Sequence, residues 1–158
     1  MSMKKFKGLL FVFIGFICLF LTTGCGNKTA IGSEDFKATM DSKEYKIVDA
    51  TSQFSEYEYV KQVYVAISSD SKYQIEFYEF DTDNNGMDFY NTNSEKFEKN
   101  QENGALKTTV SLGKYNKFTL SGNNRYQVVS RIGNTAVYVD ADAKYKDEIK
   151  KIVEELGY

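Results

Sequence analysis

Hydrophobic and polar residues follow two different periodicities along this chain. Alternating segments rich in β-branched and aromatic residues predict seven strands, at 45–50, 57–67, 73–80, 106–112, 115–121, 125–132 and 135–140. Hydrophobic residues at helical spacing predict three helices, at 33–43, from the turn at 81–86 to about residue 100, and at 142–156. We expect Ser33 to cap the first helix and Asp142 the last, because such side chains accept hydrogen bonds from the free N–H groups of a first turn.

The predicted elements follow the order α-β-β-β-α-β-β-β-β-α. Short turns such as Gly133-Asn134 join most consecutive strands, which is typical of β-hairpins. No parallel crossover is required, so we expect an α+β domain with an antiparallel sheet of six to seven strands. We expect the helices to pack on one face of this sheet, with the C-terminal helix contributing a hydrophobic stripe to the core: Tyr145, Ile149, Ile152, Val153 and Leu156.

The first 24 residues have the pattern of a secretory signal. Lys4, Lys5 and Lys7 precede a hydrophobic run from Leu9 to Leu21. This run is shorter than the roughly 20 residues that a membrane-spanning helix needs. A positive segment followed by a short hydrophobic one is typical of a signal peptide.

The signal ends at Leu21-Thr22-Thr23-Gly24-Cys25, which resembles the bacterial lipobox. In that motif a small residue precedes a cysteine that is lipidated and becomes the new N-terminus. The usual lipobox has leucine three places before the cysteine, where this chain has Thr22. The chain is similar to small lipoproteins of Gram-positive bacteria, and the resemblance implies a lipid on Cys25 and a position on the outer face of the cytoplasmic membrane. Two or more acyl chains would hold it there stably.

We therefore divide the chain into a signal peptide at 1–24, a lipidated tether at 25–32 and a single α+β domain at 33–158. The tether is predicted to be flexible because it is short and rich in glycine and polar residues. Cys18 lies within the signal, so the domain itself has no cysteine. Its length is sufficient to bury a core without disulfides.

Composition excludes several classes of function. The chain has no histidine, which removes the usual general base, zinc sites of the Cys/His kind, and Ser-His-Asp or Cys-His catalysis. Removal of the signal leaves a net charge of −5 and no basic cluster, which disfavours nucleic-acid binding. We predict no cofactor and no enzymatic activity.

The segment Asp81-Thr82-Asp83-Asn84-Asn85-Gly86 matches the first half of a calcium loop, with Asp81, Asp83 and Asn85 as candidate ligands. The match ends there, because Thr92 stands where the bidentate glutamate belongs. The alternative is a strand-to-helix turn in which Asp83 or Asn85 caps the helix, and we favour that interpretation.

Tyrosines gather on two predicted neighbouring strands and give a candidate binding surface: Tyr57, Tyr59, Tyr64, Tyr73 and Tyr78. Tyrosine offers contact area at low entropic cost, which suits a peptide or glycan ligand. The alternative is that these rings fill half-buried sheet positions.

Together these features predict a membrane-anchored extracytoplasmic lipoprotein with a non-enzymatic binding or accessory domain. Its expected partners are the membrane, through the lipid on Cys25, and a protein or cell-wall component. Two alternatives stay open: a glycan- or cell-wall-acting hydrolase that uses paired carboxylates, and a calcium-dependent adhesion module.

Overall fold

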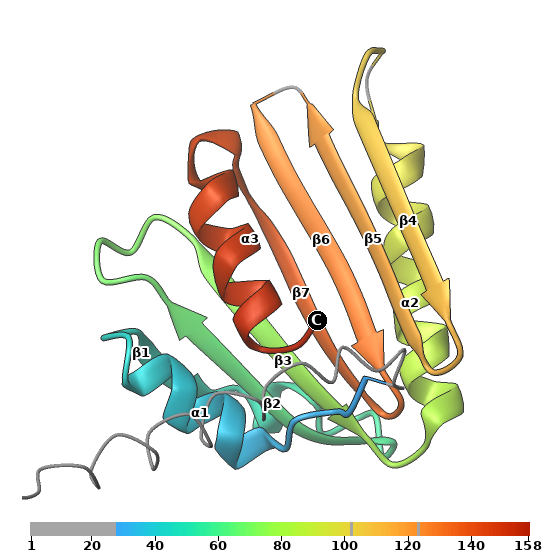
Figure 1. The fold of residues 1–158 in the computed structure, drawn as a ribbon. Coiled ribbons are helices and arrows are strands. Elements are labelled where there is room, and N and C mark those ends of the chain that lie inside the picture. Colours follow the sequence, from blue (N-terminus) through green and yellow to red (C-terminus); the bar gives the residue numbers. More distant parts are fainter. Residues whose placement is uncertain (1–27, 102, 123) are drawn as a thin grey trace, which may run out of the picture.

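Seven strands form one antiparallel sheet in the order β1-β2-β3-β7-β6-β5-β4 (Figure 1). The structure is a computed structural model that describes residues 28–101, 103–122 and 124–158. The strands are β1 (Lys46–Asp49), β2 (Val60–Ile67), β3 (Gln74–Phe80), β4 (Leu106–Leu112), β5 (Tyr115–Gly122), β6 (Arg125–Ile132) and β7 (Thr135–Asp142). The predicted α+β class, with an antiparallel sheet and three helices, is confirmed.

Local turns explain the part of the sheet from β4 to β7. Consecutive strands from β4 to β7 form hairpins, and Gly133 supplies the positive φ that the β6–β7 turn requires. One connection is long. The helix α2 (Asp83–Lys99) carries the chain from β3 to the far edge at β4, so β7 returns to pair with β3 at the centre.

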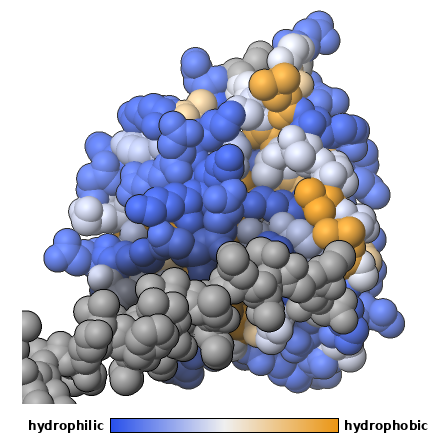
Figure 2. Space-filling model, viewed as in Figure 1, coloured by the Kyte–Doolittle hydropathy of each residue, from blue (hydrophilic) through white to orange (hydrophobic). Residues whose placement is uncertain are grey.

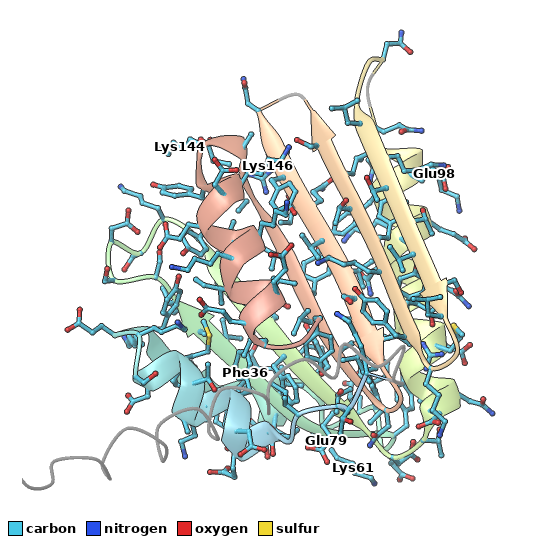
Figure 3. The ribbon with its side chains drawn as sticks, viewed as in Figure 1. Phe36, Lys61, Glu79, Glu98, Lys144 and Lys146 are labelled. Atoms are coloured by element: carbon cyan, nitrogen blue, oxygen red, sulfur yellow. The ribbon has the colours of Figure 1, made fainter. Side chains whose placement is uncertain are left out.

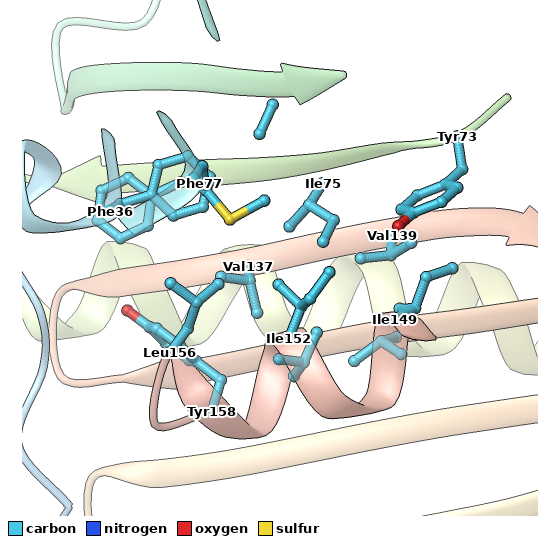
Figure 4. Close-up of a cluster of buried hydrophobic side chains, with 14 of the residues drawn as sticks. Phe36, Tyr73, Ile75, Phe77, Val137, Val139, Ile149, Ile152, Leu156 and Tyr158 are labelled. Carbon is cyan, nitrogen blue, oxygen red and sulfur yellow. The ribbon is translucent and has the colours of Figure 1, made fainter. Parts of the chain in front are cut away.

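The terminal helices α1 (Ser33–Asp41) and α3 (Lys146–Glu155) lie on one face of the sheet, as expected. The rings of Phe36 and Phe77 stack there with centroids 4.9 Å apart. Most of the predicted C-terminal stripe is buried in the same core: Ile149, Ile152, Val153 and Leu156. Figure 4 shows Ile149, Ile152 and Leu156 there. This core also receives Tyr158, which is fully buried.

Helix α2 lies on the opposite face (Figure 1), which corrects the expectation that all helices share one face. Its Phe97 stacks on Phe118 and Tyr138 at centroid distances of 6.4 and 5.2 Å. The physical reason is that the central strands are hydrophobic on both sides. Val128 and Val129, neighbours that point to opposite faces, are both 0% exposed.

Helix starts differ in detail from the predicted caps. Gly32, without a side-chain cap, precedes α1, so Ser33 is its first residue rather than its cap. Thr82 caps α2 by accepting a hydrogen bond from the Asn85 backbone N–H. Asp142 caps a short 3-10 helix, η2 (Ala143–Tyr145), that leads into α3.

Residues 28–32, predicted to be part of a flexible tether, lie against the domain. The Lys28 Nζ donates a hydrogen bond to the Gly157 carbonyl at 2.7 Å, and Ala30 and Ile31 pack on the α1–α3 core. The predicted signal at 1–24 and Cys25 fall outside the described residues. Within the described ranges, every helix is too short or too polar to cross a membrane.

Candidate functional site: an aromatic groove beside α2

A groove of about 420 Å³ opens between α2 and the segment that leads into β2. We call it the aromatic groove, because six rings and one aliphatic side chain form most of its lining. Four polar residues of α2 form the opposite wall. The full lining is Phe54, Tyr57, Tyr59, Val60, Tyr78, Phe80, Asn85, Asp88, Phe89, Thr92 and Asn93.

The outer wall of the groove is built by two successive turns that end the 3-10 helix η1 (Thr51–Phe54). The Tyr57 N–H donates to the Phe54 carbonyl, and the Val60 N–H donates to the Tyr57 carbonyl, both at 2.9 Å. These turns replace the first three residues of the strand predicted at 57–67. Tyr57 and Tyr59 therefore leave the sheet and stand 48% and 41% exposed, with ring centroids 5.7 Å apart.

The floor of the groove is a set of packed rings. Tyr78 contacts Phe89 and Phe54 at centroid distances of 4.4 and 5.6 Å. Its hydroxyl donates to a Glu76 carboxylate oxygen at 2.5 Å. Burial, with the nearby negative charge of Glu76, raises the pKa of Tyr78. The floor is therefore hydrophobic and uncharged at neutral pH.

The inner wall is held in place by the close approach of α2 to the β6–β7 turn. A Cβ atom built on Gly86 would lie only 2.7 Å from the Gly133 carbonyl oxygen, so glycine is needed there. Beside it, the buried Arg131 guanidinium donates to the backbone carbonyls of Gly133 and Asp83 at 2.9 and 3.3 Å. Burial lowers the pKa of Arg131 from its usual high value, while the negative charge of Asp83 raises it.

The described lining of the groove carries negative charge only. Asp88 is the single charged side chain among its described lining residues. Glu56 and Glu58 flank Tyr57 in the sequence and are exposed. A ligand in the groove would meet rings on one side and amide, hydroxyl and carboxylate groups on the other, without a basic side chain from the lining to bind an anion.

The structure divides the five predicted tyrosines between the two faces of the sheet. Tyr57, Tyr59 and Tyr78 line the aromatic groove. Tyr64 and Tyr73 belong to the core on the α1–α3 face. The Tyr64 hydroxyl donates to Glu34 at 3.1 Å, and the Tyr73 hydroxyl shares a short hydrogen bond with the hydroxyl of Tyr45.

The candidate calcium ligands are bound to other side chains. An Asp81 carboxylate oxygen accepts a hydrogen bond from the Asn85 amide at 2.6 Å, and the Asp83 carboxylate pairs with Lys114 at 2.6 Å. Asp81 and Thr82 form the turn between β3 and α2, and residues 83–86 form the first turn of the helix. Across the described ranges of the chain, the structure shows no group of three or more acidic, histidine or cysteine residues placed to hold a metal ion.

A second hollow, of about 390 Å³, also has two carboxylates in its lining, Glu76 and Asp140. Glu76 accepts hydrogen bonds from Gln74 and Tyr78, at 2.8 and 2.5 Å. Asp140 is held by the Arg125 guanidinium at 2.5 and 2.9 Å. Both carboxylates are therefore bound to neighbouring side chains of the sheet surface.

Comparisons with protein-family models, with curated proteins and with solved structures found no match to this chain. Function is therefore inferred from the residues and their geometry alone. Sequence reasoning singled out Tyr57, Tyr59 and Tyr78 but missed the wall that α2 supplies. The positions that fix this wall, Gly86 and Arg131, depend on a contact between α2 and a turn almost 50 residues later in the chain.

Proposed function

We propose that the protein is a lipid-anchored extracytoplasmic binding protein whose domain takes its ligand in the aromatic groove. The lipid on Cys25 would hold it at the outer face of the cytoplasmic membrane, as the signal and lipobox pattern at 1–25 indicates. The proposed binding role is non-enzymatic.

The exposure of Tyr57 and Tyr59 is the observation that carries the binding role. Among the large hydrophobic side chains that the structure describes, four are exposed, and two of those four line this groove. Exposed aromatic rings beside a concave, mostly hydrophobic floor are typical of ligand sites. Tyrosine is suited to this role because it buries a large surface while losing little rotamer freedom.

The lining indicates the chemistry of the ligand. Asp88 is the only charged side chain among the lining residues that the structure describes, so an uncharged or cationic group fits better than an anionic one. Asn85, Thr92 and Asn93 offer hydrogen-bonding groups along the same wall. A glycan or peptide segment that lays a hydrophobic face on the two rings and turns its polar groups toward α2 meets both requirements.

Replacement of the lipidated residue tests the anchor. Cys25→Ala should abolish lipidation and cleavage before residue 25, so that no mature domain held by a lipid is formed, because the thiol is the proposed lipid attachment point. Fractionation of cells that express the variant and the wild type measures this. Processing at the same site, with the mature variant retained on membranes, would contradict the proposal.

Comparative capture tests the groove. The lipidated protein would be recovered from native membranes with its bound molecules, which are then quantified by mass spectrometry. The double variant Tyr57→Ala/Tyr59→Ala should lose at least one bound species by about tenfold, the effect of losing roughly 1.4 kcal/mol of binding free energy. Leu106→Ala is the matched control, since Leu106 is 72% exposed and lies outside the groove lining. Identical species for all three proteins would refute the groove as the binding site.

A further inference from the structure

Four loops lie side by side along one end of the sheet, connected by backbone hydrogen bonds. The Asp81 N–H donates to the Tyr59 carbonyl, the Phe80 N–H to the Asn134 carbonyl, and the Gly133 N–H to the Lys114 carbonyl, at 2.8–3.0 Å. We call this end the loop edge and define it by residues 57–59, 80–82, 112–115 and 133–134. It contains one rim of the aromatic groove and the β4–β5 turn.

Exposed hydrophobic side chains concentrate on this loop edge. Three of the four exposed large hydrophobic residues in the described chain belong to it: Tyr57, Tyr59 and Leu112, with exposures of 48%, 41% and 69%. The fourth, Leu106, begins β4 and lies at the opposite end of that strand. Figure 2 shows separate hydrophobic side chains over the part of the surface where Figure 1 places β4.

Lys28, which follows Cys25 by three residues, also lies at this edge. The Lys28 Nζ lies 4.1 Å from the centroid of the Tyr115 ring, and Tyr115 is the direct ladder partner of Leu112. Cys25 precedes Lys28 by three residues, which span at most about 11 Å when fully extended. A lipid on Cys25 would therefore enter the membrane close to Leu112, and this end of the domain would face the bilayer.

The charges along the loop edge are mixed, with basic side chains around Leu112 and the acidic Glu58 and Asp81 at its groove end. Lys28 lies over the Tyr115 ring, Lys114 is in the β4–β5 turn, where it pairs with Asp83, and Lys117 follows two residues into β5. Burial lowers the pKa of Lys117, and the neighbouring Lys28 lowers it further, while Glu154 raises it. Lys28 and Lys114 are exposed. Figure 3 shows Lys61 and Glu79 at the same end of the sheet. Lysines next to an exposed leucine are typical of side chains that contact headgroups while the leucine reaches the acyl boundary.

We propose that the domain rests end-on on the membrane, with the loop edge against the bilayer and Leu112 inserted at the headgroup–acyl boundary. The proposal depends on the lipid anchor of the proposed function, because the anchor determines which end faces the membrane. Tyrosine favours such an interface, where its ring is partly buried and its hydroxyl stays wet. The aromatic groove would then open at the membrane surface and would meet ligands that are attached to the membrane or lie close to it.

A single thiol probe at each of two matched positions tests this orientation. Cys18 is removed with the signal and Cys25 is lipidated, so a cysteine introduced at Leu112→Cys or Leu106→Cys would be the only free thiol. Both side chains are exposed and on the same strand, at 69% and 72%, so both variants should fold alike. Each lipidated variant would be labelled with an environment-sensitive dye and placed in vesicles of equal parts phosphatidylcholine and phosphatidylglycerol.

Two quenchers of the dye, one carried on lipid chains and one dissolved in water, show which position lies in the membrane. A quencher carried on lipid chains should reduce the emission of the dye at position 112 several-fold more than that at position 106, and aqueous iodide should show the reverse order. Equal quenching at both positions, or stronger lipid quenching at 106, would overturn the end-on orientation. If neither variant carries a lipid or stays with the vesicles, the anchor itself is wrong and the proposed function fails with it.

Discussion

Truncation of Ile152 should lower the free energy of unfolding by about 2.5–5 kcal/mol, if α3 is a permanent part of the core. Ile152 is 6% exposed and lies in one hydrophobic cluster with Val137 and Ile149 (Figure 4). Ile152→Ala removes three buried carbons, which at about 0.8 kcal/mol each gives about 2.4 kcal/mol. The unfilled cavity adds the remainder.

Urea unfolding of residues 26–158 measures this loss. With an m-value of about 2 kcal/mol/M, a loss of about 3 kcal/mol moves the midpoint down by about 1.5 M. Lys151→Ala is the matched control on the exposed side of the same helix, and it should change the free energy of unfolding by less than about 0.5 kcal/mol. A loss below about 0.5 kcal/mol for Ile152→Ala would show that α3 leaves the sheet in solution, and the helix would become a candidate partner surface.

Three further predictions concern the metal, the wall of the groove and alkaline pH. Thermal melts in chelator and in excess calcium should agree, because Asp81 and Asp83 already have protein partners; a rise of several degrees with calcium would revive the metal site. Gly86→Ala should lower the melting temperature, because the new Cβ would lie 2.7 Å from the Gly133 carbonyl oxygen. This should outweigh the better helix propensity of alanine. An unchanged or higher melting temperature would contradict that close approach. Burial, followed by the negative charges of Asp140 and Glu76, raises the pKa of Tyr138 to about 12. The folded state then binds more protons than the unfolded state above pH 10, so stability should fall between pH 10 and about 12. Tyr138→Phe should reduce this fall, and a fall of the same size in the variant would refute the part assigned to Tyr138.

Local sequence signals predicted most of the fold. The strands from β4 to β7 lie within two residues of their predicted ends, because alternation and the Gly133-Asn134 turn specify a hairpin without reference to the rest of the chain. The pairing of β3 with β7 has no such signal. That pairing places strands that are hydrophobic on both faces at the centre of the sheet. Helix α2 covers the face opposite α1 and α3.

Capping and strand starts were less predictable because several residues could serve equally well. Thr82, Asp83 and Asn85 all have side chains that cap helices, and the structure uses Thr82. Tyr57 and Tyr59 have the β propensity of the strand that follows, but two turns hold them outside the sheet. β propensity is similar for the residues before and after Val60, so it does not determine where the strand begins. The turns that leave Tyr57 and Tyr59 exposed depend on packing against β3 and α2.

The candidate site could be predicted only in part, for the same reason. The tyrosine cluster was visible in the sequence, but strand alternation separates Tyr64 from Tyr78 onto opposite faces of the sheet. Deciding which ring joins which face requires the β2–β3 register, which pairs Val63 with Tyr78. The α2 wall of the groove depends on Gly86 and Arg131, whose contacts cross from α2 to the β6–β7 turn.

The intact mass of the wild-type protein purified from membranes tests the lipid-anchored account most directly. We predict a chain that begins at Cys25 and carries a diacylglyceryl group on the thiol of that residue, with residues 1–24 removed. A membrane-associated protein that still contains residues 1–24, begins at another residue, or has a free thiol at Cys25 would contradict it.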